Sequence, residues 1–305
     1  MRGLHTHTVF WKMIEAMRSL LAVALVLATA GCAGSAAKTD LPRTFDGEIA
    51  LQLVADQLAL GPRVPGTAAH ESGVRWIVAA LEQEGWEVET QAFAFEGGSG
   101  TNILGQLGQG DPPPILLGAH YDSRPIADRD EASPAAPVPG ANDGASGVAV
   151  LLELARVLPD AGLSRPVWLA FFDQEDGGGA AGGEWIQGSR AFAAELATMP
   201  AAAVIVDMVG DADLQLYYEN NSDPLLRETI WGTAASLGFE SFAPSPRHSI
   251  LDDHIPFIER GIPTVLIIDF DYPYWHTTHD TLDKVSAESL EQVGRTLEAW
   301  LRAQP

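Results

Sequence analysis

Three short segments that are apolar at almost every position place the strongest constraint on how this chain folds. They are residues 115–120 (ILLGAH), 167–172 (VWLAFF) and 203–209 (AVIVDMV). A strand with one face in water alternates apolar and polar residues, whereas a strand buried on both faces is apolar throughout. These segments therefore predict central strands of a mainly parallel sheet that helices cover on both sides.

Segments with helical spacing of apolar residues alternate with these strands. We expect helices over residues 47–60, 69–84, 145–158, 189–196, 224–237, 254–260 and 287–302, and further strands over residues 86–95, 102–107, 214–218 and 264–268. With 46% hydrophobic residues, the chain of 305 residues can bury one large core. The pattern predicts an α/β fold, a single-domain three-layer α/β/α arrangement around a mixed, mainly parallel sheet.

The N-terminal residues are typical of an export signal. The stretch MRSLLAVALVLATAGC (residues 17–32) has a basic start, an apolar run too short to span a bilayer, and small residues before Cys32. It looks like a bacterial lipoprotein signal in which Cys32 is lipidated, although Thr29 stands where leucine is usual. An ordinary secretory signal is the alternative. We expect residues 1–32 to be the signal, 33–44 a tether, and 45–305 the catalytic domain of an exported protein, anchored to a bacterial membrane and facing the periplasm or the cell exterior.

Composition excludes several classes of function. The net charge is −23, with 41 acidic and 18 basic residues, so binding to nucleic acid is not expected. Cys32 is the only cysteine. The remaining chain therefore has no disulfide, no thiol nucleophile and no cysteine-ligated metal.

Polar residues follow the ends of most predicted strands, where an α/β sheet gathers its site. They are His120, Asp143, Asp173, Glu175, Asp176, Asp207, Asp252 and His276. Carboxylates that converge without basic partners repel one another, and a divalent cation removes that repulsion. Imidazole and carboxylate ligands without thiols suit Zn²⁺. The alternative is that these side chains are ordinary loop acids in water.

The order of the motifs HYDS, NDGASG, FFDQED, DMVGD, DDHIPF and WHTTHDT resembles that of the M28 family of zinc-dependent exopeptidases and the related M28-type glutaminyl cyclases. The resemblance runs from residue 60 to residue 285 and implies a zinc-exopeptidase-like fold. It implies that Asp143, Asp176 and His276 bind zinc. It also implies that Glu175, one residue before a ligand, is the general acid/base.

The resemblance leaves two activities open. A glutaminyl cyclase (glutaminyl-peptide cyclotransferase) holds one zinc and closes an N-terminal glutamine into pyroglutamate with release of ammonia. An aminopeptidase holds two zincs, the second through His120 and Asp207, and hydrolyses the first peptide bond with activated water. The pattern DDHIPF followed by WHT favours the cyclase, with Asp207 and Asp252 contributing to catalysis and Trp275 lining the substrate pocket. The animal cyclases have glutamate where Asp176 stands.

Peptide or protein N-termini are the substrates in both cases, and we expect a monomer. A non-catalytic binding protein is a third, remote alternative. We expect supporting roles for four further residues: Asp173 and Arg63 as structural groups, and His279 and Asp280 as residues that hold the loop around His276.

Overall fold

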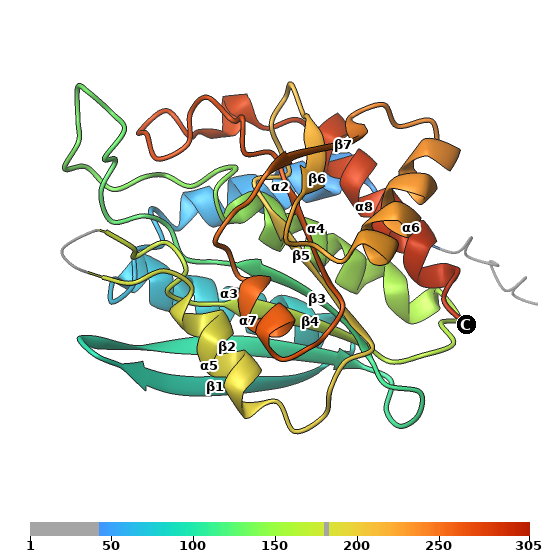
Figure 1. Ribbon diagram of the computed structural model, residues 1–305. Helices are drawn as coiled ribbons and strands as arrows, with labels where there is room; N and C mark the ends of the chain where they lie inside the picture. The colour runs from blue at the N-terminus through green and yellow to red at the C-terminus, as the bar shows by residue number, and fades with distance from the viewer. Residues whose placement is uncertain (1–42, 180–182) are drawn as a thin grey trace, which may run out of the picture. The chain divides into compact units, whose positions relative to one another are not determined.

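A six-stranded mixed sheet lies at the centre of the computed structural model, which describes residues 43–179 and 183–305 (Figure 1). The strand order is β1-β2-β4-β3-β5-β8. β3, β4, β5 and β8 run parallel to one another, whereas β2 is antiparallel to both β1 and β4. The bounds are β1 Glu87–Phe95, β2 Gly98–Leu107, β3 Ile115–His120, β4 Val167–Phe172, β5 Ala202–Asp207 and β8 Thr264–Ile268. The predicted α/β fold with a mixed, mainly parallel sheet is confirmed.

The helices form two layers on opposite faces of the sheet (Figure 1). The helices α2 (Gly47–Ala59), α3 (Ala68–Gln83), α4 (Ala145–Val157) and α8 (Ala287–Arg302) share one apolar cluster with the sheet. The shorter helices α5 (Gln187–Glu195) and α7 (Ile255–Glu259) pack into a second cluster against the other face. The described residues also form two 3₁₀ turns, Leu158–Asp160 and Leu282–Lys284.

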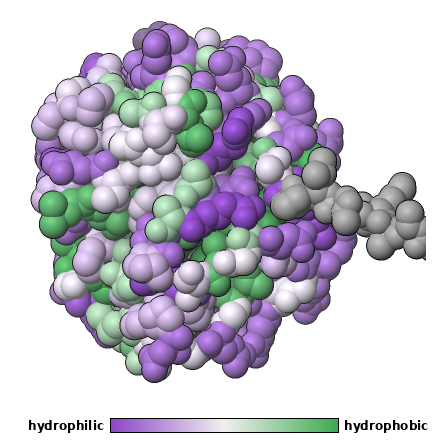
Figure 2. All heavy atoms as spheres, turned by 90° about the vertical axis from the view of Figure 1, so that its right-hand side faces the viewer, coloured by the Kyte–Doolittle hydropathy of each residue, from purple (hydrophilic) through white to green (hydrophobic). Residues whose placement is uncertain are grey.

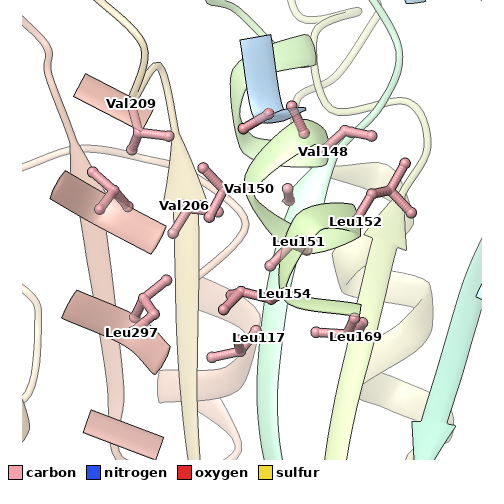
Figure 3. Packing of buried hydrophobic residues seen from close by; sticks show 14 of the residues in the cluster. Leu117, Val148, Val150, Leu151, Leu152, Leu154, Leu169, Val206, Val209 and Leu297 are labelled. Carbon is pink, nitrogen blue, oxygen red and sulfur yellow. The ribbon is translucent and has the colours of Figure 1, made fainter. Parts of the chain in front are cut away.

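The alternation of side chains along the strands explains the two clusters. Leu117 of β3, Leu169 of β4 and Val206 of β5 point to the face that α4 covers (Figure 3). Their neighbours Leu116 and Ile205 belong to the opposite cluster. Successive strand residues point to opposite faces, so strands buried on both sides need the continuous apolar runs that this sequence has.

Polar residues that precede several helices fix where those helices begin. Asp46, Thr67, Asp223 and Ser286 each accept a hydrogen bond from backbone N–H groups in the first turn of the following helix. These bonds satisfy donors that have no partner inside the helix. Helix α4 begins differently: its N-cap is Gly144, which has no side chain to accept such a bond and directly follows Asp143.

A two-stranded parallel sheet stands beside the main one, and the sequence predicted only half of it. It pairs β6 (Leu216–Glu219) with β7 (Phe242–His248), and α6 (Pro224–Ser236) connects them. β7 was missed because its sequence, FAPSPRH, contains two prolines, which lack the N–H that a strand donates. The predicted strand over 203–209 ends earlier, at Asp207, because Met208 has a left-handed backbone with φ of 46°.

The N-terminal predictions lie mostly outside the described residues, which begin at residue 43. This applies to the signal segment with Cys32 and to most of the tether. Among residues 43–179 and 183–305, no helix has the length and apolar character that crossing a bilayer requires. The face drawn in Figure 2 shows hydrophilic residues with hydrophobic ones scattered between them.

Candidate metal centre

The predicted site residues meet at the carboxyl ends of the parallel strands. His120 is the last residue of β3 and Asp207 is the last residue of β5. The acidic segment with Glu175 and Asp176 follows β4, which lies next to β3. Parallel strands end at the same edge of a sheet, and the topology therefore brings these separate motifs together.

Asp143 stands between two groups of possible metal ligands. The first group is His120, Asp143 and Asp207, and the second is Asp143, Asp176 and His276. His120 Nε2 lies 3.2 Å from Asp143 Oδ1 and 3.1 Å from Asp207 Oδ1. His276 Nε2 lies 4.0 Å from Asp143 Oδ2 and 3.4 Å from Asp176 Oδ1. Asp143 therefore directs one carboxylate oxygen to each group.

The hydrogen bonding of these side chains fits a bound metal ion. Asp143 Oδ2 and Asp176 Oδ2 are fully buried, and among the described residues neither oxygen has a hydrogen-bond partner. A buried oxygen without a partner is unfavourable, so it marks a position where another group belongs. Both groups consist of nitrogen and carboxylate oxygen donors, which bind divalent metals.

The electrostatics of the site point the same way. Burial raises the pKa of Asp176 to about 7, and the charge of Asp143 adds to that effect. Burial also raises the pKa of Glu175 well above its usual range, assisted by the neighbouring carboxylates Asp176, Asp253 and Asp252, although His120 opposes it. Asp207 and Asp252 have raised pKa values as well, chiefly from burial. A divalent cation would stabilise the ionised form of all these groups.

Asp143 differs from the other acids. Burial raises its pKa, but the hydrogen bond from His120 and the charges of His120, His276 and Arg124 outweigh burial and lower it below its usual value. Asp143 is therefore the carboxylate that this site most readily keeps ionised.

Two buried carboxylates hold the backbone of the ligand-bearing loops. Asp122 accepts hydrogen bonds from the backbone N–H groups of Glu175 (3.1 Å) and Asp176 (3.2 Å). Asp280 accepts from the backbone N–H of Asp143 (3.1 Å) and of the residue before it, and from the Tyr272 hydroxyl. The site is thus preorganised through its backbone as well as through its side chains.

Of the two residues expected to hold the loop around His276, Asp280 does so: it accepts hydrogen bonds from the Tyr272 hydroxyl and from the backbone N–H of Asp143. His279 is exposed. The group that contacts His276 is Asp128, whose Oδ1 lies 3.1 Å from His276 Nδ1. The loop from residue 121 to residue 143 folds back over the site, and sequence proximity to His276 was therefore a poor guide to contact.

The two residues expected to be structural lie where that role requires. Asp173 is buried and binds His70 Nε2 (2.8 Å) and the backbone N–H of Thr101 (2.8 Å). Arg63, 1% exposed, donates to the carbonyl oxygens of Tyr121 (3.2 Å), Pro139 (3.1 Å) and Gly140 (2.6 Å). Arg63 thereby closes the loop between His120 and Asp143.

Strained backbone is concentrated around the site. Among the described residues, the non-glycine positions with positive φ are Gln174 (59°), Ile186 (56°), Met208 (46°) and His276 (59°). Gln174 and Met208 adjoin predicted site residues, and His276 is one of them. Such conformations are unfavourable for most side chains and are found most often where a site requires them.

A small cleft of about 150 Å³, open to solvent, is lined by these residues. Its polar lining includes Glu175, Asp176, Asp207 and Asp252. Trp275, the predicted pocket residue, lines it together with Trp185. The centroids of the two indole rings lie 4.0 Å (Trp275) and 5.9 Å (Trp185) from that of the His276 imidazole. The remaining lining residues are Asp143, Met208, Ile250, Leu251, Ile268, Phe270 and His276.

Sequence reasoning missed three residues at the site: Arg124, Asp128 and Trp185. Arg124 is buried and donates to Asp176 Oδ1 at 3.1 Å. Arg124 and Asp128 are four residues apart in the segment RPIAD, a spacing that is compatible with an ion pair between them. This spacing does not indicate that either residue contacts a possible metal ligand. Trp185 lines the cleft, but a glycine-rich stretch separates it in sequence from the motif that ends at Asp176. No local sequence pattern predicts that position.

Comparison with known proteins agrees with this geometry. The family model described as Peptidase family M28 matches residues 102–301. Aminopeptidase YwaD of Bacillus subtilis is 27% identical over 273 residues, which cover 81% of this chain but only 55% of YwaD.

Two solved structures from Bacteroides thetaiotaomicron are similar at 31% identity. A leucine aminopeptidase precursor has a TM-score of 0.82, covering 87% of this chain and 99% of that chain. A glutaminyl cyclase bound to N-acetylhistamine has a TM-score of 0.81, covering 87% and 100%. The fold is therefore zinc-exopeptidase-like. Because the family model matches well over half of the sequence, and because buried histidines and aspartates meet where strands of this fold end, the chain belongs to peptidase family M28.

Proposed function

We propose that this protein is a zinc-dependent glutaminyl-peptide cyclotransferase that converts the N-terminal glutamine of peptides to pyroglutamate and releases ammonia. The observation that carries the proposal is the cleft: Glu175 lines it beside Asp143, Asp176 and His276, and two tryptophans that contact the His276 ring line it as well. Solved glutaminyl cyclases of three further bacteria, Tannerella forsythia, Porphyromonas gingivalis and Fimbriiglobus ruber, are also similar to this chain, at 28–33% identity.

The residues that would hold the zinc are Asp143, Asp176 and His276. One possible ligand atom from each of the three side chains lies within 4.8 Å of the other two. Asp143 Oδ2 and Asp176 Oδ2 are buried and have no hydrogen-bond partner among the described residues. When bound, zinc supplies a Lewis acid that polarises the side-chain carbonyl of the substrate glutamine.

Glu175 is the proposed proton carrier. Its side chain lines the cleft and is 7% exposed, and burial raises the pKa of its carboxyl group well above the usual range. A raised pKa brings a carboxylate closer to the basicity that proton transfer near neutral pH requires. Glu175 takes a proton from the substrate's α-amine as the amine nitrogen bonds to the side-chain carbonyl carbon. It then gives the proton to the departing amide nitrogen, which leaves as ammonia.

Asp207 and Asp252 complete the polar side of the cleft. We propose that they orient the α-amine through hydrogen bonds, because both are buried carboxylates on the cleft lining. Trp275 and Trp185 belong to the apolar lining, together with residues such as Ile250, Leu251 and Phe270. A small cleft with this lining suits one side chain better than an extended peptide, which favours glutamine cyclisation over peptide hydrolysis.

An aminopeptidase is the second candidate, and one observation favours it. The His120, Asp143 and Asp207 group has ligand atoms close enough to hold a second metal ion. The similarity to YwaD and to the leucine aminopeptidase precursor is consistent with that activity.

One experiment separates the two candidates. Purified protein is analysed for zinc content and assayed for ammonia release from a glutamine-initiated peptide and for cleavage of aminoacyl anilides. One zinc per chain with ammonia release alone supports the cyclase. Two zincs with anilide cleavage and no ammonia release would contradict it and establish the aminopeptidase.

We also propose that the protein is exported and lipid-anchored through Cys32, because a short apolar run and small residues precede this cysteine. Metabolic labelling with a palmitate analogue tests this directly. Label in the wild-type chain but not in Cys32→Ser supports the anchor, and equal label in both contradicts it.

A further inference from the structure

The loop after β3 carries two residues that contact proposed zinc ligands from outside the cleft. Arg124 contacts Asp176, and Asp128 contacts His276. Arg124 is 2% exposed, and the side chain of Asp128 is 41% exposed. Neither residue lines the cleft. Their contacts join two of the three proposed ligands to one loop.

Asp128 is fixed by a two-point contact with Arg124. Arg124 Nε donates to Asp128 Oδ1 at 2.7 Å, and the Nη2 atom donates to Oδ2 at 3.0 Å. Such paired bonds set the orientation of a carboxylate as well as its position. The orientation matters because Asp128 Oδ1 also lies 3.1 Å from His276 Nδ1.

The charge of Asp128 favours the form of His276 that can bind a metal. The ionised carboxylate lies 3.1 Å from Nδ1 and attracts a proton to that nitrogen, and a proton on Nδ1 of the neutral imidazole leaves Nε2 with its lone pair. Nε2 faces Asp176 Oδ1 at 3.4 Å and Asp143 Oδ2 at 4.0 Å. A bare nitrogen facing two carboxylates is unfavourable unless a cation lies between them.

Arg124 acts on the second ligand as well. Its Nη1 atom donates to Asp176 Oδ1 and to the backbone oxygen of Asp176, each at 3.1 Å. One carboxylate oxygen of Asp176 is therefore occupied, whereas Oδ2 remains without a partner among the described residues. The guanidinium also lies over the Trp185 ring, with Cζ 4.9 Å from the ring centroid.

We propose that Arg124 and Asp128 are positioning residues that hold His276 and Asp176 in the orientation that binds metal. Arg124 fixes the orientation of the Asp176 carboxylate, and Asp128 keeps the proton of His276 on Nδ1. This inference rests on the proposed function, because it assumes that Asp143, Asp176 and His276 bind zinc.

The first test measures zinc affinity by competition with a chelating dye, independently of activity. Asp128→Ala should weaken zinc binding about 10- to 100-fold, the usual effect of removing a group that orients a metal-bound histidine. Arg124→Lys should weaken it similarly, because a lysine ammonium keeps the charge but cannot bond both carboxylates in the same geometry. Wild-type affinity in Asp128→Ala would overturn the proposal, and wild-type affinity in Arg124→Lys would overturn the role of the guanidinium fork.

Asp130→Ala is the matched control. Asp130 lies in the same loop and ties it to the His276 loop through the backbone N–H and the hydroxyl of Thr278, but it contacts none of the three proposed ligands. Zinc affinity close to wild type in Asp130→Ala supports a specific contact. A loss equal to that of Asp128→Ala would show that loop order, and not the carboxylate at position 128, controls the site, and would contradict the proposal.

A second test works without metal and separates this inference from the proposed function. In metal-free protein labelled with ¹⁵N-histidine at alkaline pH, long-range proton–nitrogen spectra report which nitrogen of His276 carries the proton, and His276→Gln identifies its signal among the eight histidines. We expect a protonated Nδ1 in the wild type and its loss in Asp128→Ala. A bare Nδ1 in the wild type would refute the positioning role, whereas failure of the wild type to bind zinc would refute the proposed function alone.

Discussion

Replacing Glu175 by glutamine tests whether this side chain moves protons or only shapes the cleft. Glutamine has nearly the same shape as glutamate, but its amide group cannot act as an acid or a base near neutral pH. General acid–base catalysis contributes about 10²- to 10⁴-fold to a rate, which corresponds to about 2.7–5.4 kcal/mol of activation free energy. We therefore expect kcat to fall by that factor in Glu175→Gln, with the proposed zinc still bound, because Glu175 belongs to neither group of possible metal ligands.

The effect of Glu175→Gln on stability should be opposite to its effect on activity. Glu175 is buried beside the carboxylates of Asp176, Asp252 and Asp253, and burial together with their charges raises its pKa. A neutral glutamine removes one of these repelling charges, so the metal-free variant should unfold at the same temperature as the wild type or above it.

The assays are ammonia release from a glutamine-initiated peptide, zinc content by elemental analysis, and thermal unfolding. Glu184→Gln is the matched control, because Glu184 is exposed and does not line the cleft. Glu175→Gln protein with wild-type kcat, or without zinc, would refute the assigned role. Low activity combined with a lower unfolding temperature would indicate structural damage in place of lost proton transfer.

Three further predictions follow from the buried groups around the site. Burial raises the pKa values of Asp176 and Asp253 to about 7, whereas the unfolded chain loses these protons near pH 4. The metal-free folded state therefore loses stability as the pH rises from about 4 to about 7. In the presence of a chelator, the unfolding temperature should be lower at pH 8 than at pH 5, and added zinc should reverse this difference. The same unfolding temperature at both pH values in chelator would contradict the reasoning. Arg63→Met should lower the free energy of unfolding by about 3–5 kcal/mol, because three buried carbonyl oxygens lose a charged donor, and denaturant unfolding of the variant with a midpoint like that of the wild type would rule this out. Gly144→Ala should weaken zinc binding measured by dye competition, because φ is 90° and a Cβ atom would lie 2.7 Å from the backbone oxygen of Asp122; unchanged affinity would show that the turn tolerates a side chain.

Much of the fold was predictable because its local patterns are unambiguous. The strands Ile115–His120 and Val167–Phe172 begin and end where the apolar runs do. Burial on both faces demands apolar residues at every position, so such a strand is recognisable without knowledge of its neighbours. Patterns that depend on a partner were less informative: β2 begins at Gly98, in a glycine-rich stretch, because it pairs with β1 there.

The residues of the two possible metal-ligand groups could also be predicted from the sequence. Each residue follows a predicted strand or precedes a helix, and the ends of parallel strands share one edge of the sheet. The motif order therefore sufficed to place His120, Asp207 and Asp176 in one site. Because Cys32 is the only cysteine in the sequence, histidine and carboxylate side chains were the ligands available at the site.

By itself, then, the sequence determined the layers of the fold, the edge of the sheet where the site lies and the residue types that meet there. Only the tertiary structure decided how those residues face one another: that Asp143 directs one oxygen to each metal group, that Asp128 contacts His276, and that Trp185 closes the cleft beside it. The physical reason is the difference in sequence separation between the two kinds of interaction. Periodicity and burial act over a few neighbouring residues, whereas these contacts join segments up to about 150 residues apart, and their distances depend on how the long loops pack.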